Sequence, residues 1–301
     1  MKPNRPPLPG QPAPRLQQHW DWRAAGNFIC GGSGGGLVLF AGLAGLTGAE
    51  VRPQLAAGLV LVALGLLCVW FEIGRPWRAL NVFRHIRSSW MTREASVALA
   101  LFGAGALALL TAHPTAQALA GLCGLAFVYA QARILAADKG IPAWRHARCA
   151  PLVLGSGLAE GAGLIAVTLA GGLQLAAAAV LVLALSARLL LWRRYLDGLR
   201  ADHAPAASVQ AFDAIAPRLV RFGHLLAGGL ALLAAAGALG GLPGAGIALA
   251  AAGLLAAGAG WWFKYTLIRR AAFTQGIALK HHPVRGGKPA SLASTPRLGN
   301  A

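Results

Sequence analysis

The chain has 301 residues, of which 56% are hydrophobic and only 12% are charged. Soluble domains carry about 25% charged residues, so this composition indicates a membrane protein. The formal net charge of +18 would suit a nucleic-acid-binding protein. However, the basic residues lie between apolar runs, where they orient a membrane protein, and no soluble region is large enough to bind nucleic acid. We therefore expect no nucleic-acid partner.

Residues 1–18 are rich in Pro and Gln and show no apolar period, which predicts a disordered tail. Eight apolar runs follow, each long enough to cross about 30 Å of hydrocarbon. We expect an all-α polytopic bundle of eight transmembrane helices within residues 19–270, and a basic C-terminal tail over residues 271–301. The runs cover residues 26–46, 54–73, 94–112, 115–136, 150–170, 173–192, 219–240 and 244–263.

Three other segments have a composition of their own. Residues 193–216 are too polar to span a membrane and predict an interfacial helix and a surface loop. Residues 264–280 are basic and mildly amphipathic, so we expect them to lie along the same membrane surface as residues 193–216. The glycine-rich run 31–36 lacks the spacing of a phosphate-binding loop and predicts close helix packing instead.

The breaks between the apolar runs alternate between nearly uncharged and basic. Of the 27 Lys and Arg residues, only Arg52 lies in or beside the first set of breaks, and nearly all of the other 26 lie in or near the second set. The positive-inside rule then places both termini and the long loops in the cytoplasm of a bacterial inner-membrane protein. All nine tryptophans also lie at or near the basic side. Their placement predicts a docking surface or a pocket for a planar ligand there; the alternative is an uneven aromatic belt.

The metal-binding residue types show no pattern that would hold a metal centre. The four cysteines are scattered singly without any C-x-x-C pair, so we expect neither a cysteine-ligated iron–sulfur cluster nor a thiolate zinc site. The eight histidines fall in the expected tails, loops or helix ends. None lies well inside an expected span, where paired axial ligands of a b-type haem would be needed, so we expect no haem.

The segment 70–94, WFEIGRPWRALNVFRHIRSSWMTRE, carries five arginines and is bracketed by Glu72 and Glu94. A third carboxylate, Glu160, lies inside the fifth apolar run. Ionisable groups near or within a span are costly, so each of the three is a candidate functional residue that can exchange protons with a quinol. The alternatives are structural: Glu94 favours a helix N-terminus, Glu72 pairs with a nearby arginine, and Glu160 ties helices together.

The ends of this segment resemble a known family. Glu72-Ile73-Gly74-Arg75-Pro76-Trp77-Arg78-Ala79-Leu80-Asn81, followed by Ser88-Ser89-Trp90-Met91-Thr92-Arg93-Glu94, resembles the anchor subunit of dimethyl sulfoxide reductase and its polysulfide-reductase-like relatives. A weaker match is Val128-Tyr129-Ala130-Gln131-Ala132-Arg133-Ile134 with Pro142-Ala143-Trp144 after it. The eight expected spans also fit this family.

The resemblance implies a haem-free membrane subunit that exchanges electrons between a quinone, menaquinone or ubiquinone, and an iron–sulfur subunit. That subunit serves a molybdopterin catalytic subunit, here on the cytoplasmic face. Glu94 matches the family carboxylate associated with the quinol site, whereas Glu72 stands where many relatives have a histidine. The candidate residues for quinone binding or proton exchange are Glu94, Glu72, Arg78, Asn81 and Ser89, and those for partner docking are Trp77, Arg84, Arg87 and Trp90.

Several alternatives remain open at this point. Residues 19–28, which lead into the first span, and the long N-terminal tail are similar to the membrane subunit of phenylacetyl-CoA:acceptor oxidoreductase. The motif within residues 72–94 fits a sulfoxide-type reductase equally well. In either branch the chain performs no substrate chemistry of its own. Two other classes are a small-molecule transporter with a midplane site, which only Glu160 supports, and a purely structural anchor.

Overall fold

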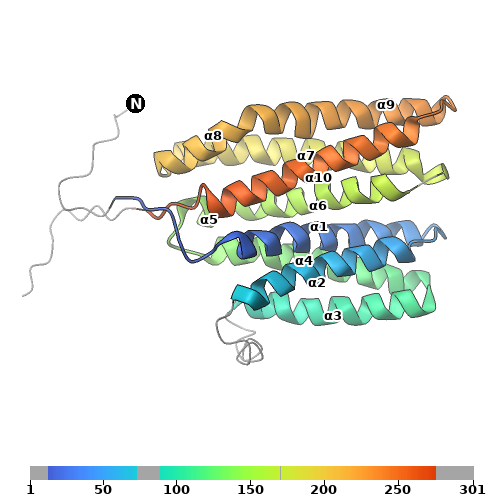
Figure 1. The fold of residues 1–301 in the computed structure, drawn as a ribbon, viewed down its shortest axis with the longest axis horizontal. Helices are drawn as coiled ribbons and strands as arrows, with labels where there is room; N and C mark the ends of the chain where they lie inside the picture. The colour runs from blue at the N-terminus through green and yellow to red at the C-terminus, as the bar shows by residue number, and fades with distance from the viewer. Residues whose placement is uncertain (1–12, 73–88, 170, 276–301) are drawn as a thin grey trace, which may run out of the picture. The chain divides into compact units, whose positions relative to one another are not determined.

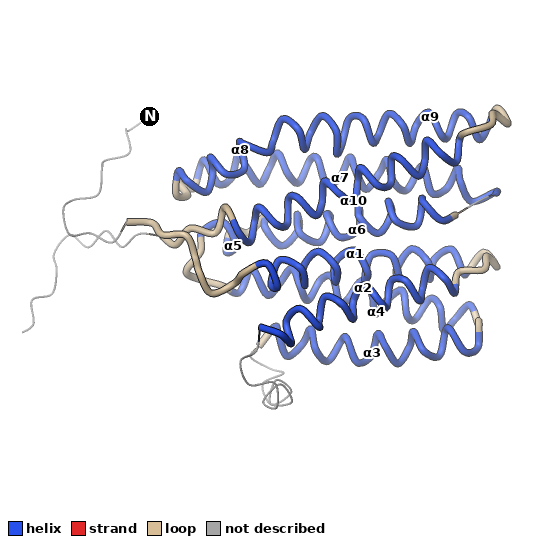
Figure 2. Tube along the Cα trace, viewed as in Figure 1, coloured by secondary structure: helices blue, strands red, loops and turns tan. Residues whose placement is uncertain are grey.

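A computed structural model describes residues 13–72, 89–169 and 171–275 of the chain. Within these ranges the backbone is helix and loop, as Figure 2 shows, apart from one isolated β-bridge. The central part of the family-like motif, residues 73–88, lies outside the described residues, and so do most residues of both predicted tails.

Eight helical segments of the described chain are long and apolar enough to cross a membrane, which confirms the all-α, eight-span prediction. The seventh span, Ala206–Leu239, is continuous and consists of α8, a π-helical turn and α9. The elements are α1 Trp22–Gly45, α2 Arg52–Glu72, α3 Trp90–Thr111, α4 Pro114–Ala137, a short α5 Pro142–Arg145, α6 Cys149–Thr168, a 3-10 turn η2 Gly171–Leu173, α7 Gln174–Ala201, α8 Ala206–Val220, the π-helical turn η3 Arg221–Leu226, α9 Ala227–Leu239 and α10 Ala245–Arg269.

Local sequence signals explain where several helices begin. The Asp21 carboxylate accepts the backbone N–H of Arg23 and caps α1. Ser89 caps α3 in the same way through the N–H of Thr92. Pro114 opens α4 at a position where the missing N–H costs nothing, because the first helical amides have no intrahelical partner.

Helix α1 lies at the centre of the bundle and packs against α2, α4 and α6. Figure 1 shows α1 to α4 on one side and α6 to α10 on the other. The glycine-rich run 31–36 is buried at these contacts, as predicted. A Cβ on Gly34 would lie 2.5 Å from the carbonyl oxygen of Gly58, and one on Gly36 would overlap the Gly157 backbone. The absence of side chains therefore allows α1 to approach two neighbours closely.

The prediction for residues 193–216 was wrong. Helix α7 continues to Ala201 and α8 begins at Ala206, so that only a short loop separates two long helices. The apolar residues on one face of this stretch hold it in the bundle: the Phe212 ring packs edge-on against Trp192 and Tyr195, at 5.7 and 5.6 Å between ring centroids. Likewise α10 runs on to Arg269, so residues 264–269 belong to the last span rather than to a surface segment.

The segments before α1 and after α10 pair with each other. Leu16 and Phe273 form an antiparallel bridge, Gln17 N donates to Ala272 O at 2.9 Å, and Thr274 N donates to the Arg15 carbonyl at 2.8 Å. These contacts hold residues 15–17 against residues 272–274.

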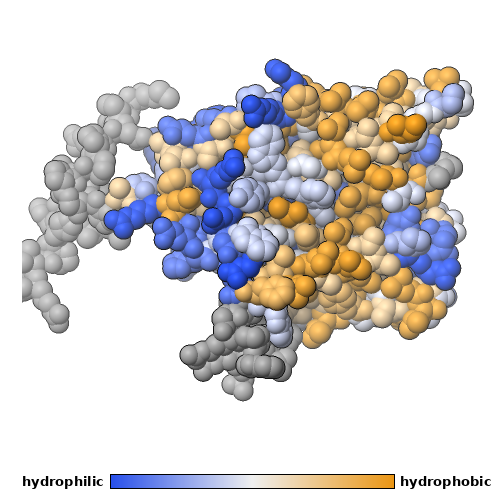
Figure 3. Space-filling view, viewed as in Figure 1, coloured by the Kyte–Doolittle hydropathy of each residue, from blue (hydrophilic) through white to orange (hydrophobic). Residues whose placement is uncertain are grey.

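The alternation of the connections is the predicted one. In Figure 1 the links α1–α2, α3–α4, α6–α7 and α9–α10 lie at one end of the bundle, and the start of α1, the short α5 and the α7–α8 link lie at the other. In the view of Figure 3 apolar residues cover most of the right-hand half of the bundle, whereas hydrophilic residues gather on its left-hand half and at its right-hand end. We call the end that holds α5 the basic end, since Arg145, Arg148 and Arg200 of the described residues lie there.

Candidate quinone site

Glu94 lies in the second turn of α3 and is buried, with 6% of its surface exposed. The amide of Asn27, on α1, donates to Glu94 Oε1 over a long 3.4 Å. The side-chain amide of Gln131, on α4, also hydrogen-bonds Glu94, and its Nε2 donates to the Asn27 carbonyl at 3.0 Å. Three helices thus bring two neutral amides to one carboxylate. Within the described residues Glu94 has no ion pair.

An unsatisfied acceptor lies in the same cluster. Asn27 is only 3% exposed, and its Oδ1 has no hydrogen-bond donor among the described residues. Gly65 of α2 packs closely against this oxygen, since a Cβ there would lie only 3.2 Å from it. Buried acceptors without a donor are rare and call for an explanation, such as a bound ligand with a hydroxyl group.

Glu72 has a different environment. It ends α2, is half-buried, and lies near the ion pair of Arg23 with Asp21, whose charged atoms are 2.8 Å apart. Arg23 Nη1 also donates to the Phe71 carbonyl at 2.5 Å. Within the described residues no hydrogen bond or ion pair joins Glu72 to Glu94. The Arg23 hydrogen bonds hold the pKa of the Asp21 carboxyl below its usual value, so Asp21 stays charged.

The structure describes two of the other predicted site residues. The Ser89 hydroxyl accepts the Thr92 amide at 3.4 Å as the cap of α3. Trp90 is half-buried between two guanidinium groups, with Arg93 at 4.3 Å and Arg133 at 4.8 Å from its ring centroid. The other predicted residues lie outside the described part of the chain: Trp77, Arg78, Asn81, Arg84 and Arg87.

Glu160 forms a second buried cluster with a partner that the sequence reading missed. Lys264 Nζ donates to Glu160 Oε2 at 2.7 Å, and both side chains are at most 1% exposed. Ser33 Oγ donates to the same oxygen at 2.6 Å, and Ser156 Oγ donates to Oε1 at 3.1 Å. Lys264 was expected outside the last span. The apolar residues that follow it, Tyr265, Leu267 and Ile268, are the signal that extends the helix.

His224 lies elsewhere than the sequence predicted. The expected seventh span placed His224 at a helix end, but it lies well inside the continuous segment Ala206–Leu239 and is 4% exposed. Arg188 Nε donates to His224 Nε2 at 3.2 Å, and Nδ1 lies 3.0 Å from the Leu219 carbonyl. Because arginine can only donate, Nε2 must accept and Nδ1 must carry the proton. Both ring nitrogens are therefore occupied.

The clusters of Glu94 and Glu160 are neighbours along α1. A Cβ on Gly32 would overlap Lys264 Nζ and lie 3.6 Å from Gln131 Oε1. Lys264 also donates to the Phe28 carbonyl at 2.9 Å, one residue after Asn27. A buried cation thus lies beside the amide that contacts Glu94, although its salt bridge is with Glu160.

No curated protein matches the sequence. A family model described as the DMSO reductase anchor subunit (DmsC) matches residues 25–152. This range contains Asn27, Glu94 and Gln131, the three residues of the first cluster. The chain thus matches the DMSO reductase anchor subunit family over residues 25–152, which confirms the resemblance that its motifs indicated.

Proposed function

We propose that this chain is the membrane anchor and quinone-reactive subunit of a molybdopterin oxidoreductase complex, with its quinone site at Glu94. The observation that carries the proposal is a buried carboxylate, Glu94, beside a buried amide oxygen, Asn27 Oδ1, that has no donor among the described residues. Both lie within the stretch that matches the anchor-subunit family, near the start of α3.

The cluster suits proton exchange with a quinol. On oxidation a quinol loses two protons and two electrons and becomes a quinone. In our proposal the Glu94 carboxylate accepts a proton from one quinol hydroxyl, releases it towards water and then accepts the second proton, while Asn27 Oδ1 accepts a hydrogen bond from a quinol hydroxyl. The electrons pass to an iron–sulfur partner subunit, which delivers them to the molybdopterin subunit. Quinone reduction reverses these transfers with the same groups.

The location of the partners follows from charge. The basic end of the bundle holds the start of α3, and the positive-inside rule places that end in the cytoplasm of a bacterial inner membrane. We therefore propose that the iron–sulfur and catalytic subunits dock on the cytoplasmic face, at or near the half-buried Trp90. Glu72, near the surface charges Asp21 and Arg23, is proposed to pass protons between this site and water.

The Glu160 cluster favours a structural role rather than transport. A midplane transport site needs a charged group that is free to bind a substrate. Glu160 instead has a lysine and two serine hydroxyls on its two oxygens, and Lys264 also bonds a backbone carbonyl. These contacts tie α1, α6 and α10 together.

The test is Glu94→Gln in the assembled complex. We expect quinone-linked turnover to fall at least about 100-fold, the usual contribution of a positioned acid or base. Electron transfer from a soluble dye, which bypasses the membrane subunit, should persist. The matched control is Glu50→Gln, since Glu50 is exposed at the opposite end of the bundle and pairs with Arg52. Loss of dye-linked activity together with loss of the partner subunits would make Glu94 structural and overturn the proposal.

A further inference from the structure

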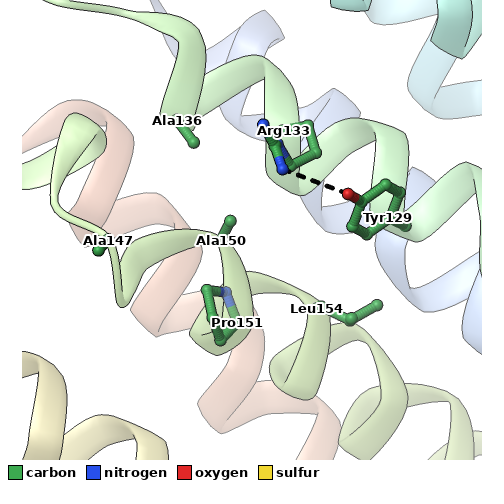
Figure 4. Close-up of a pocket in the computed structure, with 7 residues that line it drawn as sticks. All are labelled: Tyr129, Arg133, Ala136, Ala147, Ala150, Pro151 and Leu154. Carbon is green, nitrogen blue, oxygen red and sulfur yellow. Dashed lines mark hydrogen bonds between the residues drawn. The ribbon is translucent and has the colours of Figure 1, made fainter.

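A pocket separate from the Glu94 cluster lies between α4 and α6. Its volume is about 400 Å³, within the usual range of ligand pockets. Figure 4 shows side chains of α4 and of the start of α6 facing the space between them from opposite sides. The pocket is lined by Tyr129, Arg133, Ala136, Ala147, Ala150, Pro151 and Leu154.

The charge of the lining points to an anionic ligand. Among the described residues that line it, Arg133 carries the charge and none is a carboxylate. Arg133 Nη1 donates to the Tyr129 hydroxyl at 3.2 Å, and the guanidinium lies over the Trp90 ring. Its Nε is buried without a hydrogen-bond acceptor among the described residues. The cation is thus fixed in place while part of its donor capacity is unused.

The rest of the site is apolar and continues along α4. Leu122, Ala126 and Tyr129 are exposed, and Arg133 and Ala136 continue the same row at alternating spacings of four and three residues. This spacing places all five on one face of the helix. The row leads from the arginine, one turn before the end of α4, into the membrane-spanning part of the helix. A ligand that fits it has an anionic head and an apolar chain.

We propose that this pocket binds an anionic phospholipid, with its phosphodiester at Arg133 and the Tyr129 hydroxyl and an acyl chain along Leu122 and Ala126. Basic pockets between transmembrane helices on the cytoplasmic side commonly bind anionic lipid headgroups. A quinone head is uncharged and would leave the cation uncompensated. Since Trp90 contacts Arg133 and lies one turn before Glu94 on α3, the bound lipid fixes the start of that helix.

The experiment uses the purified full chain in nanodiscs with spin-labelled phosphatidylglycerol or phosphatidylcholine as the probe. We expect the motionally restricted fraction to favour phosphatidylglycerol about fivefold, the ratio expected for one basic residue near an anionic headgroup. Arg133→Gln should abolish the preference. The matched control Arg270→Gln, whose guanidinium lies 5.6 Å from the Tyr265 ring centroid, should retain it.

A second variant separates lipid binding from loss of the arginine. Ala150→Leu fills the pocket and leaves Arg133 intact, so it should reduce the restricted fraction as well. The proposal is overturned if both Arg133→Gln and Ala150→Leu keep the phosphatidylglycerol preference, or if the two lipids bind equally to the unmodified chain. Displacement of the restricted lipid by a short-chain quinone would assign the pocket to quinone instead. None of these outcomes depends on turnover at Glu94.

Discussion

Glu94 and Glu160 are both buried carboxylates that face α1, yet their surroundings differ in kind. Glu160 receives a lysine at 2.7 Å and two serine hydroxyls, so its charge is matched and its lone pairs are used. Glu94 has two neutral amides, one of them at 3.4 Å, and an orphan amide oxygen beside it. Glu160 is thus neutralised by a buried cation, whereas a carboxylate among neutral amides can exchange a proton without breaking an ion pair.

The largest expected effect comes from breaking the matched pair. Lys264→Met leaves the Glu160 charge buried and uncompensated, which should cost about 3–5 kcal/mol of stability. The measurement is the unfolding midpoint of the purified chain in detergent. The double variant Lys264→Met/Glu160→Gln removes both charges and should recover most of the loss. A double variant as unstable as the single one would show that packing, not charge, holds this part of the bundle.

Comparing the same substitution at Glu160 and Glu94 distinguishes a role in assembly from a role in quinone turnover. Glu160→Gln should lower the yield of assembled complex because it removes one half of an ion pair. Turnover per assembled complex should change little, since Glu160 is not placed at the quinone. Glu94→Gln should do the opposite, keeping the yield and losing quinone-linked turnover. Both quantities are measured on one preparation, by subunit content and by quinol-dependent activity. A turnover loss of equal size in the two variants would remove the distinction.

A smaller effect is expected at the orphan acceptor. Asn27→Ala removes both the amide that donates to Glu94 and the free oxygen, so quinol should bind less tightly. We expect KM to rise about fivefold, equivalent to about 1 kcal/mol for one hydrogen bond, with kcat nearly unchanged. Gln54→Ala is the matched control, because Gln54 on α2 is also buried with an oxygen that lacks a donor among the described residues. An equal rise in both variants would mean that Asn27 acts only through the fold.

The sequence predicted the eight spans because each is a long apolar run, and this signal is local. It also singled out Glu94 as a candidate, because a carboxylate at the start of a span is costly and because Glu94 matches a family carboxylate; its role at the quinone stays a prediction. It could not identify Lys264 as the partner of Glu160, because the two are 104 residues apart and meet only when α6 and α10 pack. The same applies to Asn27 and Gln131, two amides in unremarkable positions whose meeting at Glu94 depends on three helices.

His224 was misplaced for a related reason. The polar stretch before it suggested a surface segment, so the expected span began only five residues earlier. In the fold, Phe212 and Ile215 are buried and extend the helix by more than three turns. Polar residues on one face of a helix that projects beyond the bundle lower its average hydropathy without making the segment a loop.

The smallest expected effect is a pH dependence of stability at the basic end. His146 follows α5 and lies 3.5 Å from Asp202, and its burial lowers its pKa below the ordinary value of 6.5, although Asp202 opposes the shift. The folded state therefore favours neutral His146 more than the unfolded state does. Stability from this group is complete above about pH 6.5 and falls as the pH drops below it, because the unfolded chain then binds more protons.

The variant His146→Asn should flatten this part of the profile. We expect the unfolding midpoint of the unmodified chain to fall more steeply between about pH 6.5 and pH 5 than that of the variant, with the two curves parallel above pH 7. The difference should be small, because Asp202 is largely exposed and stabilises the protonated ring only weakly. A variant that falls more steeply than the unmodified chain would mean that the Asp202 contact dominates over burial and that the folded state prefers the charged imidazole.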